Sequence, residues 1–189
     1  IATYPDSATE AEALVRCADI AMYKIKEKTS NQYHFFTDEM EREVHDTLLL
    51  EDKLRIALEK DEFQLFYQPQ FNALSKKIVG LEVLLRWNPD DEGFIPPGRF
   101  IPKAEEMGFI VPIGNWVIDK ACQQLRHWLN IGLIDNNIHL AINISMQQML
   151  NTSLTSYIQS AIQRHQLPAN CIEIEITESV MMVDVNKLI

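Results

Sequence analysis

The sequence is short of cysteine, glycine, proline and long apolar runs, and each shortage excludes a class of protein. The three cysteines, Cys17, Cys122 and Cys171, are odd in number and far apart, so neither a disulfide framework nor a zinc site is expected. Six glycines and eight prolines in 189 residues are too few for a low-complexity chain, and 47% hydrophobic residues argue against disorder. No run approaches the roughly 18 apolar residues of a membrane-spanning helix. A folded cytoplasmic segment without direct membrane contact is therefore expected; a membrane tether, if the parent protein has one, would lie outside it.

A surplus of basic residues is also absent. The chain has 27 acidic residues against 17 lysines and arginines, a net charge of −10. This balance disfavours a broad basic face, so no nucleic acid polymer is expected as a partner. An anionic substrate would need a local arginine or a bound metal. A glycine-rich phosphate loop and a Gly-x-Ser-x-Gly elbow are missing as well.

What the chain does contain is two short runs that alternate in the same way. In residues 138–144 and 172–177, bulky aliphatic side chains occupy the even positions. Successive side chains of a strand point to opposite faces, so Asn143 and Glu175 leave the aliphatic face of their strands. Two oxygen ligands near the ends of two strands indicate a cation site rather than a core.

Strands and helices alternate along most of the sequence. Helices are predicted at about 8–28, 38–60, 101–107, 115–130 and 152–166, and strands at 32–36, 63–68, 77–87, 138–144 and 172–177, with Pro69 ending the second of these strands. The first residues also read as part of a strand. Such alternation predicts an α/β fold with parallel pairing, in an open sheet or a barrel.

Five polar residues lie near strand ends on the non-aliphatic phase: Gln68, Glu82, Arg86, Asn143 and Glu175. Ligand-binding groups gather at the carboxyl ends of strands in both architectures. Carboxylate and amide oxygens suit Mg²⁺, Mn²⁺ or Ca²⁺, and a guanidinium suits a phosphate, so together they would serve a metal-assisted attack on a phosphoester. Two simpler readings stay open: Glu82 and Arg86 as an ordinary ion pair, and Asn143 as a partner of a backbone group.

Several motifs in fixed order make this part of the chain resemble the EAL domain, the family of cyclic di-GMP phosphodiesterases. They are residues 66–69 (Phe-Tyr-Gln-Pro), 79–87 (Val-Gly-Leu-Glu-Val-Leu-Leu-Arg-Trp), 100–106 (Phe-Ile-Pro-Lys-Ala-Glu-Glu), 141–145 (Ala-Ile-Asn-Ile-Ser) and 173–179 (Glu-Ile-Glu-Ile-Thr-Glu-Ser). The signature reads Glu-Val-Leu instead of Glu-Ala-Leu, which keeps the glutamate, Glu82, in place.

The resemblance implies a (β/α)₈ TIM-type barrel that hydrolyses cyclic di-GMP to linear pGpG with Mg²⁺ or Mn²⁺, acting as a homodimer through the EAL domain. Matching motifs would make Glu82, Asn143 and Glu175 metal ligands. Gln68, Leu84 and Arg86 would contact the substrate, and Glu178 would organise a loop. An alternative is a catalytically inactive EAL domain that serves as a cyclic di-GMP receptor or a protein-interaction module.

The family's Asp-Asp-Phe-Gly motif, its later lysine and its later glutamates would lie beyond Ile189. The catalytic base and the acids of a second metal are therefore expected outside this sequence. Only the first half of the barrel is expected here, and the 189 residues alone are expected to be inactive.

Residues 18–26 (Ala-Asp-Ile-Ala-Met-Tyr-Lys-Ile-Lys) and 31–36 (Asn-Gln-Tyr-His-Phe-Phe) resemble the end of a GGDEF domain, an α+β domain whose Gly-Gly-Asp-Glu-Phe signature is absent from this chain. The sequence therefore predicts a β-α-β remnant of a GGDEF domain at 1–40, a helical linker at 41–50 and an EAL domain at 51–189. The parent would be a tandem GGDEF–EAL protein.

Overall fold

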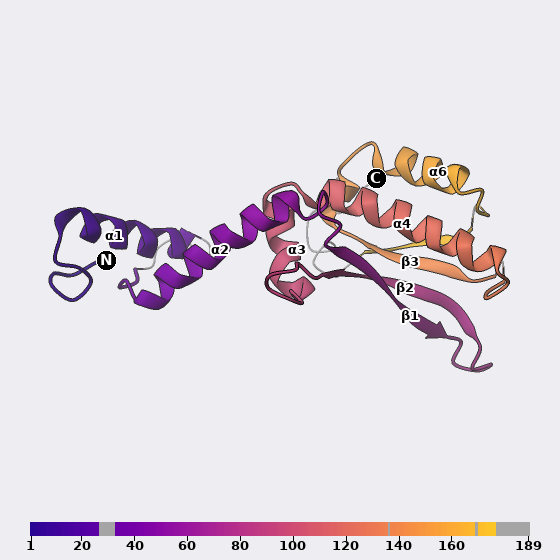
Figure 1. Ribbon diagram of the computed structural model, residues 1–189, viewed down its shortest axis with the longest axis horizontal. Coiled ribbons are helices and arrows are strands. Elements are labelled where there is room, and N and C mark those ends of the chain that lie inside the picture. Colours follow the sequence, from indigo (N-terminus) through magenta and orange to yellow (C-terminus); the bar gives the residue numbers. More distant parts are fainter. Residues whose placement is uncertain (27–32, 136, 169, 177–189) are drawn as a thin grey trace. The chain divides into compact units, whose positions relative to one another are not determined.

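The computed structural model of the chain describes residues 1–26, 33–135, 137–168 and 170–176 (Figure 1). The chain divides into two compact units, residues 1–53 and residues 54–189. Helix α2 (Asp38–Ile56) begins in the first unit, and its last turn belongs to the second.

The first unit is built from α1 (Ala11–Lys26) and most of α2. Ion pairs of 3.2 Å between Arg16 and Glu41 and of 3.0 Å between Lys24 and Glu43 join the two helices. In the described residues, the strands expected around this helix are not formed as strands. Ile1 nevertheless donates to His34 O at 2.7 Å and accepts from Phe36 N at 2.7 Å, which is the pattern of a parallel pair. One such pair is too short for a strand.

The second unit contains a four-stranded sheet in the order β1-β2-β3-β4 (Figure 1). The strands are β1 (Phe63–Phe71), β2 (Ile78–Trp87), β3 (His139–Ile144) and β4 (Ile172–Ile176). Parallel pairing is confirmed for β2, β3 and β4, whereas β1 and β2 pair antiparallel. The turn between β1 and β2 is too short for a parallel crossover, which needs a dozen or more residues.

The prediction that Pro69 ends the strand beginning at residue 63 is wrong. Strand β1 runs through Pro69, which lies opposite Leu81, and continues to Phe71. A proline removes one backbone donor, and an edge strand tolerates this loss on its unpaired side. The longer strand places Gln70 opposite Gly80 of β2.

Among the described residues, four helices follow β2: α3 (Pro97–Glu106), α4 (Ile110–Asn130), α5 (Met146–Met149) and α6 (Leu154–Arg164). Helix α3 begins four residues earlier than predicted because Pro97 fits the first helical position. Helix α4 begins five residues earlier, since Pro112 lies in the first turn, where backbone N–H groups lack helical partners anyway. The short helix α5 was not predicted.

The core lies between one face of the sheet and helices α3, α4 and α6 (Figure 1). Phe63, Trp87 and Phe100 pack with ring centroids 5.4–5.9 Å apart, and Trp87 and Phe100 are fully buried. We call this side, with Val83, Leu140, Ile142 and Ile144, the helix-covered face. Within the described part of the chain, no helix combines the length and apolar character needed to cross a membrane.

Candidate functional site

The other side of the sheet carries most of the polar side chains of the strands. Residues directly opposite one another in paired strands share a face, so the register defines this side. We call it the polar face; its members are Gln64, Phe66, Gln68, Gln70, Gly80, Glu82, Leu84, Arg86, His139, Ala141, Asn143, Glu173 and Glu175.

Three predicted metal ligands lie on adjacent strands of the polar face. Asn143 Nδ2 of β3 donates a hydrogen bond of 2.8 Å to Glu82 Oε1 of β2. Glu175 of β4 is the register partner of Asn143. The structure therefore brings together Glu82, Asn143 and Glu175, which are separated by up to 93 positions in the sequence. Because Asn143 uses its amide nitrogen on Glu82, its amide oxygen stays available as a ligand.

The predicted substrate residues lie on the same face. Gln68 is exposed and lies opposite Glu82. The Arg86 guanidinium lies over the Phe66 ring at 5.4 Å from its centroid, and its Nη1 donates to Leu85 O at 2.9 Å. Among the described residues Arg86 forms no ion pair with Glu82, so the simpler reading of that pair is wrong.

Gln70 was not predicted as a site residue, because the strand was expected to stop at Pro69. Gln70 Nε2 donates a hydrogen bond of 3.1 Å to Glu175 Oε1, across the two intervening strands. Three interstrand spacings of a flat sheet would separate β1 from β4 by about 14 Å, so the contact reflects curvature toward the polar face. The signal that could have found Gln70 is its even position, shared with Gln68.

A second contact on this face joins His139 to Glu173, with 2.8 Å between His139 Nε2 and Glu173 Oε2. His139 lies beside Gly80 in the register. The polar face therefore holds its side chains by contacts between strands, whereas the helix-covered face is held by apolar packing.

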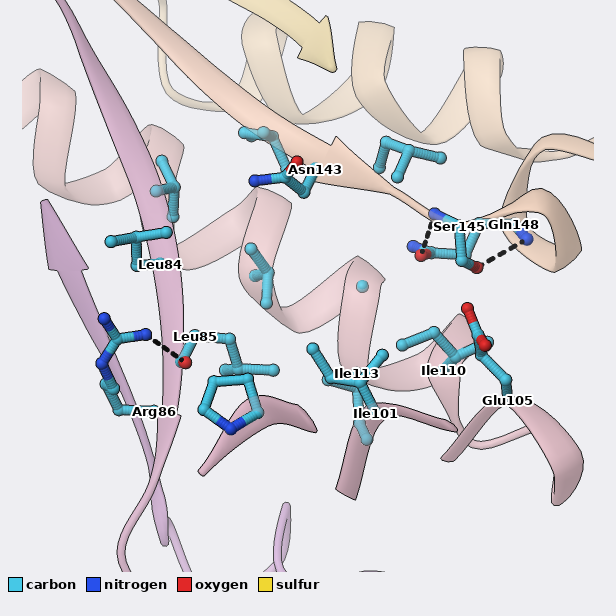
Figure 2. A pocket seen from close by; sticks show the side chains of 16 residues that line it. Leu84, Leu85, Arg86, Ile101, Glu105, Ile110, Ile113, Asn143, Ser145 and Gln148 are labelled. Carbon is cyan, nitrogen blue, oxygen red and sulfur yellow. Dashed lines mark hydrogen bonds between the residues drawn. The ribbon is translucent and has the colours of Figure 1, made fainter. Parts of the chain in front are cut away.

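A cavity of about 450 Å³ opens where β2 and β3 separate near their carboxyl ends (Figure 2). Paired residues of the two strands end at Val83 and Ile142, and both strands continue beyond them. The lining is mainly apolar, and it includes the site residues Leu84, Arg86 and Asn143. The cavity thus extends the predicted site toward helices α3 and α4.

Glu105 of α3 also lines this cavity, opposite the α5 segment (Figure 2). Partial burial raises the pKa of its carboxyl above the ordinary value. Its neighbours Ile101, Ile110 and Ile113 offer this carboxyl no hydrogen bond from their side chains.

The chain directly after Asn143 is fixed by a capping box. The Ser145 hydroxyl accepts from Gln148 N at 3.3 Å, and Ser145 N donates to Gln148 Oε1 at 3.1 Å (Figure 2). Gln148 is buried, and a Cβ at Gly114 of α4 would collide with its side chain. The Ser-x-x-Gln spacing was readable in the sequence. It holds the carboxyl end of β3, and with it Asn143.

Two titratable groups on the opposite side of the sheet belong to the core. Burial, and to a lesser extent the thiol of Cys122, raises the pKa of Tyr67 to about 12. Burial is also the main reason that the pKa of Cys122 rises to about 12. The Tyr67 ring packs edge-on against Trp128 with centroids 4.7 Å apart. A buried thiol with such a pKa is inert rather than nucleophilic at neutral pH.

The predicted ligands form a set of two carboxylates and one amide. No group of three or more His, Cys, Asp or Glu side chains suited to a metal is found in the described ranges. Glu178, predicted to organise a loop, lies outside the described residues. The three oxygen donors fit a hard divalent cation, and further ligands would have to come from other groups or water.

Comparison with known proteins agrees with this geometry. The family model "EAL domain" matches residues 51–188. The bifunctional diguanylate cyclase/cyclic di-GMP phosphodiesterase MucR of Pseudomonas aeruginosa is 41% identical over 184 residues, which are 97% of this chain and 27% of MucR. The cyclic di-GMP phosphodiesterase PdeR of Escherichia coli is 36% identical over 182 residues, 96% of this chain and 27% of PdeR. The chain thus spans about a quarter of the length of these relatives.

A solved structure, the MucR phosphodiesterase in complex with c-di-GMP, aligns with a TM-score of 0.69 at 39% identity. The alignment covers 74% of this chain and 56% of that one. It confirms the predicted α/β fold class, the first half of a TIM-type barrel, and the match over residues 51–188 covers more than half of the sequence. The chain belongs to the EAL domain family.

Proposed function

We propose that the parent of this chain is a phosphodiesterase that hydrolyses cyclic di-GMP to linear pGpG with Mg²⁺ or Mn²⁺. The observation that carries the proposal is the convergence of Glu82, Asn143 and Glu175 from three adjacent strands. The relatives MucR and PdeR, both named as cyclic di-GMP phosphodiesterases, support it.

In this proposal the three oxygen donors hold one divalent cation, which when bound would supply Lewis acidity toward a phosphate oxygen. The Asn143–Glu82 hydrogen bond orients both side chains before the cation arrives. Such preorganisation limits the free energy that binding must spend on ordering the ligands.

The substrate would be held by the residues around this set. Arg86 has five N–H donors and uses one on Leu85 O, so others remain for a phosphate oxygen. Gln68 is exposed beside Glu82 and would add a polar contact. Leu84 lines the cavity between β2 and β3 and would contact the nucleotide through its apolar side chain.

Other parts of the proposal rest on the sequence alone. They are the GGDEF remnant at 1–40, the linker at 41–50, the EAL boundary at 51, the loop role of Glu178, the homodimer and the cytoplasmic location. The Asp-Asp-Phe-Gly motif is absent from the 189 residues, which by themselves should therefore be inactive.

The test is a hydrolysis assay on the full-length parent protein. Purified protein is incubated with cyclic di-GMP and either Mg²⁺, Mn²⁺ or excess chelator, and the products are separated by chromatography. We expect metal-dependent formation of pGpG. Binding of cyclic di-GMP without cleavage by folded protein would favour the receptor alternative. If the folded protein neither bound nor cleaved cyclic di-GMP, the phosphodiesterase proposal and the receptor alternative would both be refuted.

A further inference from the structure

The longest-range side-chain contact of the polar face joins its first strand to its last. Gln70 Nε2 donates to Glu175 Oε1 at 3.1 Å, between residues 105 positions apart. Both side chains are partly buried. Glu175 is also one of the three proposed metal ligands, so the amide of Gln70 contacts the site from outside its ligand set.

Gly80 provides the space in which Gln70 lies. Gly80 faces Gln70 on one side and His139 on the other in the register of the sheet. A Cβ built at Gly80 would lie 2.7 Å from Gln70 Oε1 and closer still to His139 Nε2. Any larger residue at this position would therefore displace one or both side chains.

The neighbouring acid is engaged separately. Glu173 lies one side-chain repeat before Glu175 on the same face, and its Oε2 lies 2.8 Å from His139 Nε2. His139 thus contacts one carboxylate of β4 and Gln70 the other, which leaves each acid with its own partner.

We propose that Gln70 is a positioning residue that orients the Glu175 carboxylate for metal binding. Gly80, which has no side chain, leaves the space across the sheet that the Gln70 side chain occupies. The inference rests on the proposed function, because Glu175 is a ligand only if the site holds a cation. Gln70 acts through Glu175 and needs no contact with the substrate. Groups that hydrogen-bond to a metal ligand typically change metal affinity or activity by about 10- to 100-fold when they are removed.

The experiment measures Mn²⁺ affinity of the full-length parent by electron paramagnetic resonance, together with kcat and KM for cyclic di-GMP. Gln70→Met keeps the length of the side chain and removes its donor. We expect Mn²⁺ affinity to fall about 10- to 100-fold, with kcat reduced at saturating metal and KM nearly unchanged. The matched control is Gln64→Met on the same face of the same strand, where Gln64 makes no side-chain hydrogen bond to another described residue.

Gly80→Ala should reproduce the loss by displacing Gln70. The double variant Gly80→Ala/Gln70→Met should bind Mn²⁺ no more weakly than Gly80→Ala alone, since both changes remove the same contact. Circular dichroism and the urea midpoint show whether each variant is folded. If Gln70→Met is folded and binds Mn²⁺ like the wild type, the inference is overturned while the proposed function stands.

A metal-free readout separates this inference from the proposed function. In protein labelled with ¹⁵N-glutamine, Glu175→Gln should shift the side-chain amide resonances of Gln70 and leave those of Gln64 in place. Unshifted Gln70 resonances would refute the contact. If the wild type binds no Mn²⁺ and cleaves no cyclic di-GMP, the proposed function fails, and the resonances of Gln70 still decide whether it holds Glu175.

Discussion

The two faces of the same sheet are stabilised in different ways. On the helix-covered face, Leu140, Ile142 and Ile144 are almost completely buried against helices. On the polar face of the same strand, Asn143 is exposed and meets Glu82 through a hydrogen bond. Neighbouring residues of a strand point to opposite sides of the sheet. The same strand therefore supplies apolar packing under the helices with its even residues and a polar contact with Asn143. Substitutions on one face should therefore change stability, and substitutions on the other should change ligand binding.

The largest effect is expected from Glu82→Gln on the polar face. This change keeps the oxygen that accepts from Asn143 and removes the charge that a cation needs. We expect Mn²⁺ affinity and pGpG formation to fall by more than the roughly 100-fold that marks the upper range for residues outside the ligand set. The free energy of unfolding should change by less than about 1 kcal/mol.

The control for this change is Glu59→Gln, which removes the same charge at an exposed position after α2. Metal binding and hydrolysis by that variant should match the wild type. An equal loss in both variants would mean that net charge rather than position controls binding, and the contrast between the two faces would fail.

A change on the helix-covered face should have the opposite signature. Phe100 is fully buried and contacts both Phe63 and Trp87. Phe100→Ala should lower the free energy of unfolding by about 3–5 kcal/mol, because it removes buried surface and leaves a cavity. Urea denaturation followed by tryptophan fluorescence measures this, with Mn²⁺ affinity of the folded fraction as the second readout. A loss of metal affinity without a loss of stability would contradict the division between faces.

How far the sequence predicts these faces can be seen at particular residues. Alternation placed Asn143 and Glu175 off the aliphatic face, and the register confirms that they are neighbours. Glu82 was a candidate on the same strand phase, and the motif resemblance implied its role as a ligand; its hydrogen bond to Asn143 spans 61 positions. The contact of Gln70 was not predicted, because a proline was taken to end its strand and edge position depends on the whole sheet.

Helix α4, which lines the cavity, shows a similar limit of prediction from the sequence. Helix α4 was predicted from its apolar stripe, but the prediction left out its first five residues, which include Pro112 and Gly114. Gly114 packs against Gln148, a contact between residues 34 positions apart that no local pattern reports. Local periodicity thus predicted the elements, whereas the contacts that build the site depend on tertiary packing.

A smaller effect is expected at the capping box of Ser145 and Gln148, which follows β3. Ser145→Ala removes the acceptor for Gln148 N and should cost about 1 kcal/mol of stability. Because Asn143 lies two residues earlier, hydrolysis should also fall modestly. Ser145→Thr keeps the hydroxyl and should restore both properties. If stability and hydrolysis were both unchanged in Ser145→Ala, the capping box would not hold the end of the strand.

The last effect concerns alkaline pH and the helix-covered face. The folded protein keeps Tyr67 and Cys122 protonated to about pH 12, while the same groups ionise near 10 and 9 in the unfolded chain. Between about pH 9 and 12 the unfolded state therefore binds fewer protons, and the free energy of unfolding falls as pH rises.

Urea midpoints from pH 8 to 11 measure this fall. Tyr67→Phe keeps the ring packed on Trp128 and removes the hydroxyl, so its midpoint should decline less steeply above pH 9. A steeper decline in Tyr67→Phe than in the wild type would contradict the burial of that hydroxyl.

The most direct test of the central claim is a crystal structure of the parent protein with cyclic di-GMP and Ca²⁺, a hard cation that takes the same oxygen ligands. We predict a cation bound by Glu82, Asn143 and Glu175, with a substrate phosphate next to it and Arg86 in contact with the nucleotide. A nucleotide bound on another surface, or a cation that contacts none of the three side chains, would contradict it.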